Sequence, residues 1–151
     1  MIMQEIDLTL RPPRSPRVAL GGFVILPRLL DKCRATIAGK NGAFKFGGAG
    51  MDRHFFHFTG LDEQALKAEV AIGKSDSEML AWIHANSNPQ RQPWEIAQWS
   101  AYHLQRGPDS DAETLQIFAE KIAVWSKLRE DIRTWFDVLD LDDHCTFGGQ
   151  P

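Results

Sequence analysis

The segment from Leu20 to Gly39 constrains the fold of this chain more than any other stretch. Its apolar residues recur three and four positions apart, the spacing that places side chains on one face of a helix. They are Leu26, Leu29, Leu30, Cys33 and Ile37. Pro27 suits the first helical turn, where its missing N–H leaves no hydrogen bond unmade, and Gly39 is a natural stop. The pattern therefore predicts a core-facing helix over about residues 26–38.

The polar residues of this predicted helix form two groups. Three charged residues fall on the side opposite the apolar stripe: Arg28, Asp31 and Lys32. Arg34 instead falls at the edge of the stripe, where a guanidinium group must extend to solvent or find an acidic partner. We predict that Arg34 pairs with Asp142 or Asp143, so that the C-terminal end of the chain folds back onto this helix.

Start and stop signals divide the rest of the chain into further helices. Residues that can cap or open a helix stand before most of the periodic stretches: Ser15 with Pro16, Asp52, Asp62, Ser75 or Asp76, Pro93 and Thr134. Residues 109–130 contain neither proline nor glycine and carry two apolar rows. This stretch predicts a long helix, ending near residues 130–133, that is buried on two sides at the centre of the fold.

These segments together predict an all-α fold. No part of the chain offers several alternating runs of β-branched residues, so a large sheet is not expected. We expect a single all-α domain over residues 1–151, built as an orthogonal bundle of about six or seven short-to-medium helices. Residues 1–14 are expected to form an extended N-terminal arm, and residues 140–151 an irregular C-terminal tail.

Charge and cysteine content limit the partners and the compartment. The chain carries 17 Lys and Arg against 20 Asp and Glu, a formal net charge of −3, whereas a general nucleic-acid binder needs a basic surface. Glu5 and Asp7 interrupt the place where a secretory signal needs an apolar core, and no run approaches the length of a membrane span. Cys33 and Cys145 lie far apart. We therefore expect a cytoplasmic protein with reduced thiols that binds neither nucleic acid nor membrane.

Two glycine-containing motifs have ordinary structural explanations. Gly73-Lys-Ser75 matches the end of a phosphate-binding loop, but Ala68 stands where that motif needs a glycine and the preceding stretch predicts a helix. We interpret it as a helix stop followed by a cap. The loop Gly47–Gly50 fails the dinucleotide fingerprint, because Arg53 stands where the last glycine belongs.

The histidines and carboxylates are candidates for metal or acid–base chemistry. His54 and His57 are three residues apart and could share an ion, but a stable site needs further ligands, so we predict no metal and no cofactor. The densest polar cluster lies near the C-terminus: Asp140, Asp142, Asp143, His144 and Cys145. Carboxylates beside an imidazole can act as a general acid and base, whereas the structural alternative is helix capping and a solvated acidic turn.

Several segments taken together are similar to a family of small bacterial proteins, the domain-of-unknown-function family 5069. They are Ser15-Pro-Arg17, Leu20-Gly-Gly22, Leu26-Pro-Arg-Leu-Leu-Asp-Lys-Cys-Arg-Ala35, Phe58-Thr-Gly-Leu-Asp62, Gly73-Lys-Ser-Asp-Ser-Glu78 and Thr134-Trp-Phe-Asp-Val-Leu-Asp-Leu-Asp-Asp143. The similarity covers about residues 11 to 148. It implies a single small domain and assigns no activity.

Two hypotheses about function follow. In the first, the protein is a binding module for another protein or for a small anionic ligand, with Arg28, Lys32 and Arg34 as its positive side. In the second, it is a small hydrolytic or metal-assisted enzyme. The residues available to that enzyme are Asp31, Asp142, Asp143 and His144. A concave pocket that holds both Arg34 and the acidic tail would favour the enzyme, whereas a flat apolar patch would favour the binding module.

Overall fold

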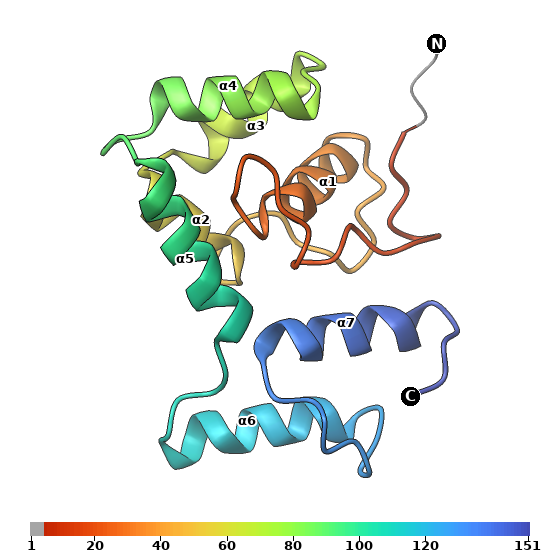
Figure 1. The fold of residues 1–151 in the computed structure, drawn as a ribbon. Helices are drawn as coiled ribbons and strands as arrows, with labels where there is room; N and C mark the ends of the chain where they lie inside the picture. Colours follow the sequence, from red (N-terminus) through yellow and green to blue (C-terminus); the bar gives the residue numbers. More distant parts are fainter. Residues whose placement is uncertain (1–4) are drawn as a thin grey trace.

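The computed structural model describes residues 5–151, which form seven helices and no sheet (Figure 1). The helices are α1 (Leu26–Ile37), α2 (Asp52–Thr59), α3 (Glu63–Ala71), α4 (Asp76–Asn86), α5 (Pro93–Gln105), α6 (Ala112–Ala123) and α7 (Trp135–Thr146). The all-α class is confirmed. In Figure 1, α5 runs steeply across the directions of α4 and α6, which is the predicted crossing of short helices.

Helix α1 forms where the apolar spacing predicts it and lies at the centre of the main core. Pro27 stands in its first turn, and the side chains of Leu26, Leu29, Leu30 and Cys33 have no exposed surface. They pack among apolar residues of the preceding loop, α2, α3, α4 and α5, with Phe23 and Phe55 at van der Waals contact edge to face. Burial of these side chains is the main favourable contribution to folding.

Most of the predicted caps set the starts of the later helices, but Asp52 does not: it is the first residue of α2, and no side chain caps that helix. Ser75 and Glu78 form a capping box at the start of α4, and Thr134 and Asp137 form another at the start of α7. The Asp62 side chain accepts a hydrogen bond from the backbone N–H of Ala65 at the start of α3. Each of these side chains satisfies backbone donors that the helix leaves without partners.

Helices α6 and α7 form a second layer below α1 (Figure 1). The two layers are joined by Phe136 of α7, whose buried ring packs against Val24 and Ile25. The central position predicted for the stretch 109–130 is wrong. Its helix ends at Ala123 and lies at the edge of the molecule, with Val124 71% and Leu128 89% exposed. The row with Phe118 and Ile122 packs on α7, while the row of Ile117, Val124 and Leu128 is exposed.

Two further expectations about local structure are corrected. Residues 140–146 are not an irregular tail but the second half of α7, because the capping box at Thr134 starts a helix that continues to Thr146. The stretch after Ser15 forms a turn rather than a short helix. In the predicted N-terminal arm, residues 1–4 lie outside the described part of the chain, and residues 11–15 are free of regular secondary structure.

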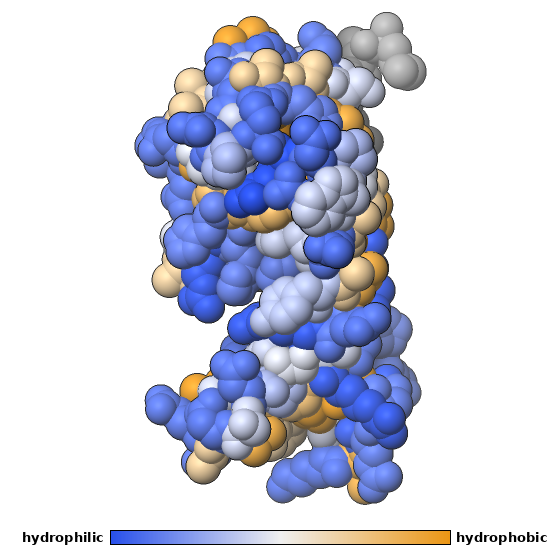
Figure 2. Space-filling view, turned by 60° about the vertical axis from the view of Figure 1, so that its left-hand side comes forward, coloured by the Kyte–Doolittle hydropathy of each residue, from blue (hydrophilic) through white to orange (hydrophobic). Residues whose placement is uncertain are grey.

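One face of the molecule is largely hydrophilic. Figure 2 shows a face dominated by hydrophilic residues, with hydrophobic residues scattered among them. Single exposed apolar residues are normal for a folded protein and need no special explanation.

Candidate binding site around Arg34

The polar side of α1 is buried rather than exposed. Arg28, Asp31 and Lys32 are each less than a tenth exposed, because the N-terminal segment, α2 and α7 cover the side opposite the apolar stripe. Each of the three has an oppositely charged partner, as buried charges require. The Lys32 ammonium donates to Asp52 at 2.9 Å, and the other oxygen of that carboxylate accepts the backbone N–H of Gly47 at 2.8 Å.

The C-terminal helix folds back onto α1 as expected, but through a different pair. Two guanidinium nitrogens of Arg28 donate to the Asp143 carboxylate at 2.7 and 3.2 Å. The predicted pairing of Arg34 with Asp142 or Asp143 is wrong. Arg34 lies six residues beyond Arg28, about 9 Å further along the helix, on the part of α1 that faces α3 and α4 instead of α7.

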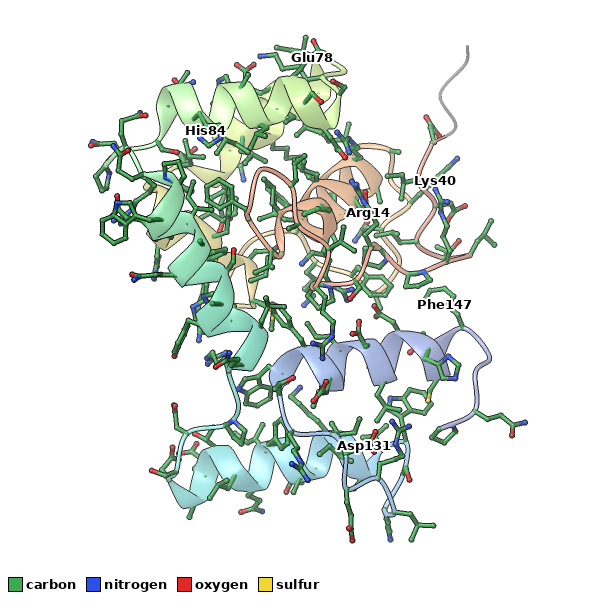
Figure 3. All side chains as sticks on the ribbon, viewed as in Figure 1. Arg14, Lys40, Glu78, His84, Asp131 and Phe147 are labelled. Atoms are coloured by element: carbon green, nitrogen blue, oxygen red, sulfur yellow. The ribbon has the colours of Figure 1, made fainter. Side chains whose placement is uncertain are left out.

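Arg34 belongs to a chain of ion pairs that joins three segments. Its guanidinium donates to Asp76 at 2.7 Å and to the backbone carbonyl of Lys74 at 3.2 Å. Asp76 also accepts hydrogen bonds from Arg14 at 2.8 and 3.3 Å. Arg14, which Figure 3 shows beside α1, continues the chain to Asp31 at 3.0 and 3.1 Å.

The titration of this cluster follows from its contacts. Burial alone would raise the pKa of Asp76, but the hydrogen bonds from Arg14 and Arg34 outweigh that effect and hold the pKa below its ordinary value. Burial likewise acts to lower the pKa of Arg14, and the hydrogen bonds to Asp76 and Asp31 reverse it, so the pKa lies above its ordinary value. Arg14 and Asp76 therefore both stay charged at neutral pH.

The candidate acidic residues of the C-terminus are not brought together. The Asp142 carboxylate accepts the indole N–H of Trp125 at 2.8 Å, and Asp143 is occupied by Arg28. One ring nitrogen of His144 lies 3.0 Å from the carbonyl of Gln150. Asp31 is held by Arg14, so the four residues proposed for acid–base chemistry face different neighbours.

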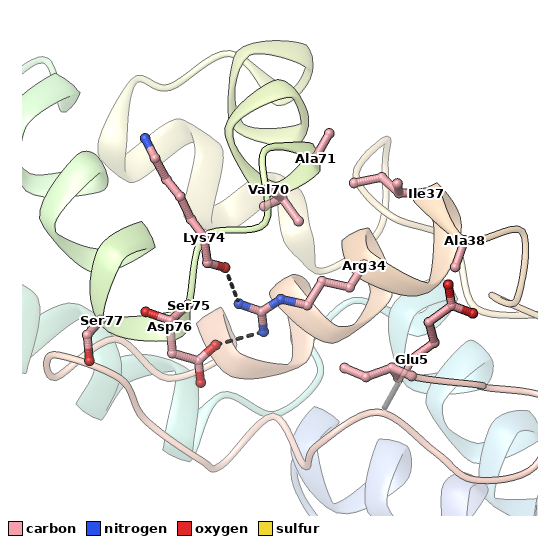
Figure 4. A pocket seen from close by; sticks show the side chains of 11 residues that line it. Glu5, Arg34, Ile37, Ala38, Val70, Ala71, Lys74, Ser75, Asp76 and Ser77 are labelled. Carbon is pink, nitrogen blue, oxygen red and sulfur yellow. Dashed lines mark hydrogen bonds and ion pairs between the residues drawn. The ribbon is translucent and has the colours of Figure 1, made fainter. Parts of the chain in front are cut away.

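A pocket of about 640 Å³ opens beside Arg34, between α1, α3 and the start of α4 (Figure 4). Apolar side chains form one wall: Ile6, Ile37, Ala38, Val70 and Ala71. Arg34, whose side chain is 24% exposed, lines the pocket as well, and the two carboxylates among the lining residues are Glu5, which pairs with Lys40, and Asp76. The side chain of Lys74 turns away from the pocket in Figure 4 and pairs with Glu69, so Lys74 contributes its backbone carbonyl instead.

The comparison with known families places the chain. The model of a family described as a domain of unknown function, DUF5069, matches residues 10–145. The chain belongs to this family. The resemblance found in the sequence is thus confirmed over residues 10–145, which is nearly the whole chain. No curated protein matches the chain. Because the family carries no known activity, function has to be argued from the geometry of this DUF5069 chain.

Sequence reasoning missed most of the pocket and all three ion pairs of the cluster beside it. Arg14 stands in a proline-rich segment and Asp76 at a helix start, so each has a local explanation that hides its contact with Arg34. The one available signal was Arg34 itself, a cation at the edge of an apolar stripe. The resemblance of Gly73-Lys-Ser75 to a phosphate loop is explained as predicted, by a helix end followed by the Ser75 cap.

A pair of histidines joins α2 to α5 elsewhere in the DUF5069 fold. The rings of His54 and His103 lie 4.9 Å apart, and burial lowers the pKa of each to about 4, helped by the nearby Arg106. Both imidazoles are therefore neutral at pH 7. Within residues 5–151, no three His, Cys, Asp or Glu side chains are grouped so as to hold a metal ion. Over the same residues, no helix has the length and apolar character needed to cross a bilayer.

Proposed function

We propose that this protein binds a small anionic molecule with an apolar body in the pocket beside Arg34. The observation that carries the proposal is one guanidinium group, only partly exposed, in a pocket of about 640 Å³ that five apolar residues also line. Pockets of this size, lined mainly by apolar groups with one or two polar groups that fix orientation, are typical of small-molecule sites. A cytoplasmic location stays a prediction that rests on the two free cysteines.

Arg34 can bind a ligand without leaving the Asp76 carboxylate unpaired. Asp76 holds two hydrogen bonds from Arg14 in addition to the one from Arg34. When an anionic ligand takes the place of Asp76 at Arg34, the Asp76 carboxylate keeps its pair with Arg14. The usual cost of breaking a buried pair, a charge left without a partner, is thereby avoided.

The apolar wall determines the rest of the ligand. Ile37, which is 42% exposed, and the buried Val70 both line the pocket. Covering such side chains with an aliphatic body contributes about 25 cal/mol for each Å² removed from water. An aliphatic carboxylate therefore fits this pocket: its carboxylate pairs with Arg34, and its hydrocarbon part packs against the apolar residues of α1 and α3.

Calorimetric titration with octanoate tests this function, with octanol and octylamine as ligands of the same length. Octanoate should bind most tightly, because only it supplies an acceptor with a negative charge to Arg34. The variant Arg34→Met should weaken octanoate binding about tenfold or more, as expected for loss of a hydrogen bond to a charged group. Arg133→Met is the matched control, because Arg133 is an exposed arginine outside the pocket.

A second variant tests the apolar wall. Ile37→Glu places a carboxylate at an exposed position on the rim of the pocket and should repel octanoate without disturbing the core. Circular dichroism of each variant verifies that the helices are retained. Equal affinity for octanoate and octanol, or octanoate binding that survives Arg34→Met, would refute the proposed function.

A further inference from the structure

Arg34 also lines a second cavity. It has a volume of about 320 Å³ and is lined by Ile6, Arg11, Pro12, Arg14, Asp31 and Arg34. Ile6 and Arg34 line both this cavity and the larger apolar pocket, so the two spaces meet at the Arg34 side chain. A ligand anchored at Arg34 can therefore extend one part into each of them.

The smaller cavity carries an excess of positive charge. Three of its six lining residues are arginines, whereas Asp31 is its single carboxylate. Asp76, which pairs with both Arg14 and Arg34, is the second carboxylate of the cluster. Arg11 is exposed and forms no ion pair with any other residue in the range 5–151. Three guanidinium groups thus face two carboxylates, and one positive charge is left without compensation.

The number of guanidinium groups distinguishes between anions. A carboxylate presents two oxygens and is satisfied by a single arginine that binds both of them. A phosphate monoester presents three oxygens and nearly two negative charges at neutral pH, which matches several arginines that approach from different sides. The cavity brings together arginines from the extended N-terminal segment and from α1.

We propose that the anionic group bound at this site is a phosphate monoester, held by Arg11 and Arg34. Its apolar substituent then occupies the larger pocket against Ile37 and Val70. This inference rests on the proposed function, since it names the class of amphipathic anion that the Arg34 pocket takes. Arg14 keeps its hydrogen bonds to Asp31 and Asp76, so neither carboxylate is left without a partner.

Titration of the same protein with octyl phosphate and octanoate tests the inference. Octyl phosphate should bind about tenfold more tightly, because it gains charge-assisted hydrogen bonds to Arg11 beyond the one that both ligands form with Arg34. Its affinity should rise with pH through the second ionisation of the phosphate, near pH 6, whereas octanoate affinity stays level over that range.

The variant Arg11→Gln separates the inference from the proposed function. Because Arg11 is exposed and unpaired among the described residues, this change leaves the fold intact; it should lower octyl phosphate affinity about tenfold and leave octanoate affinity unchanged. Arg133→Gln, an exposed arginine outside both cavities, should change neither affinity.

Each outcome decides one of the two statements. If octanoate binds through Arg34 but octyl phosphate binds no better and Arg11→Gln has no effect, the phosphate inference is overturned and the proposed function stands. If neither compound binds, the proposed function fails and the inference fails with it. Flotation with phosphatidylcholine vesicles, with and without phosphatidic acid, identifies the source of the monoester: binding to octyl phosphate alone supports a soluble compound, and binding to phosphatidic acid vesicles as well supports a lipid headgroup.

Discussion

Replacing Asp143 by alanine removes the carboxylate that neutralises Arg28 in the interior of the protein. The two side chains are only 6% and 9% exposed, and two hydrogen bonds of 2.7 and 3.2 Å join them. After the replacement, the guanidinium keeps a hydrogen bond of 3.3 Å to the carbonyl of Arg14 and a position 5.6 Å from the centre of the Phe44 ring. Neither contact supplies the missing negative charge.

The magnitude follows from the burial of the pair. Leaving one partner of a buried ion pair uncompensated lowers the free energy of unfolding by about 3–5 kcal/mol. A domain of this size is stabilised by about 5–15 kcal/mol in total, so the variant should lose a large part of its stability. The double variant Arg28→Met with Asp143→Leu removes both charges and keeps apolar volume, and we expect its stability to lie close to that of the original chain.

Urea unfolding followed by circular dichroism measures these free energies. The variant Asp140→Ala serves as a comparison, because Asp140 pairs with Arg17 and so links α7 to the N-terminal segment, but its side chain is 36% exposed. Loss of this exposed ion pair should lower the free energy of unfolding by about 1 kcal/mol or less. A loss below about 1 kcal/mol for Asp143→Ala would mean that water reaches Arg28, and the reasoning from a buried pair would be refuted. Non-additivity in the cycle of Arg28 and Asp143 variants would support direct contact.

Three further predictions concern the other charged groups. In double-mutant cycles, the effects of Arg34→Ala and Asp76→Ala on the free energy of unfolding should couple by about 1 kcal/mol, since this ion pair is partly exposed. The effects of Arg34→Ala and Asp142→Ala should be additive, because Asp142 bonds Trp125 instead. Coupling with Asp142 and additivity with Asp76 would place Arg34 at the C-terminal helix. Burial lowers the pKa of His103 from 6.5 to about 4, and it lowers the pKa of His54 to about 4 as well. As the pH falls below 6.5, these histidines therefore become protonated in the unfolded chain before they do so in the folded chain. The free energy of unfolding should then drop by about 1.4 kcal/mol per pH unit for His103 between pH 6.5 and 4, and the difference between the original chain and His103→Gln should show that slope; parallel stability profiles would contradict it. Thorough chelation should leave the thermal midpoint unchanged, and a drop that zinc or manganese restores would reveal a metal site that we did not predict.

Helix positions could be predicted because their causes are local. The apolar spacing of residues 26–37, the capping boxes at Ser75 and Thr134 and the proline at the start of α5 act within one or two turns. Such signals depend on neighbours in the sequence and not on the rest of the fold. The errors in local structure arose where a signal was outweighed, as in the C-terminal acidic stretch, which is helical although it contains several carboxylates.

The candidate site could be predicted only in part. Arg34 was recognised because a cation beside an apolar stripe requires a partner, and that requirement is visible in a single helix. Its partner Asp76 was not recognised, since an acidic residue at the start of α4 is already explained by its position in the first turn of that helix. Arg11 and Arg14 gave no signal at all, because an extended segment has no periodicity that shows which of its side chains face the protein.

The sequence by itself determined the fold class, the starts of most helices and the family, since each depends on residue order and on contacts within a few positions. Tertiary structure alone decided which carboxylate neutralises each cation of α1, which apolar row of α6 is covered and where a pocket opens. The physical reason is that charge and hydrophobicity state what a side chain requires but carry no direction in space. The packing of α7 against the first half of α1, and of α4 near its second half, supplies that direction.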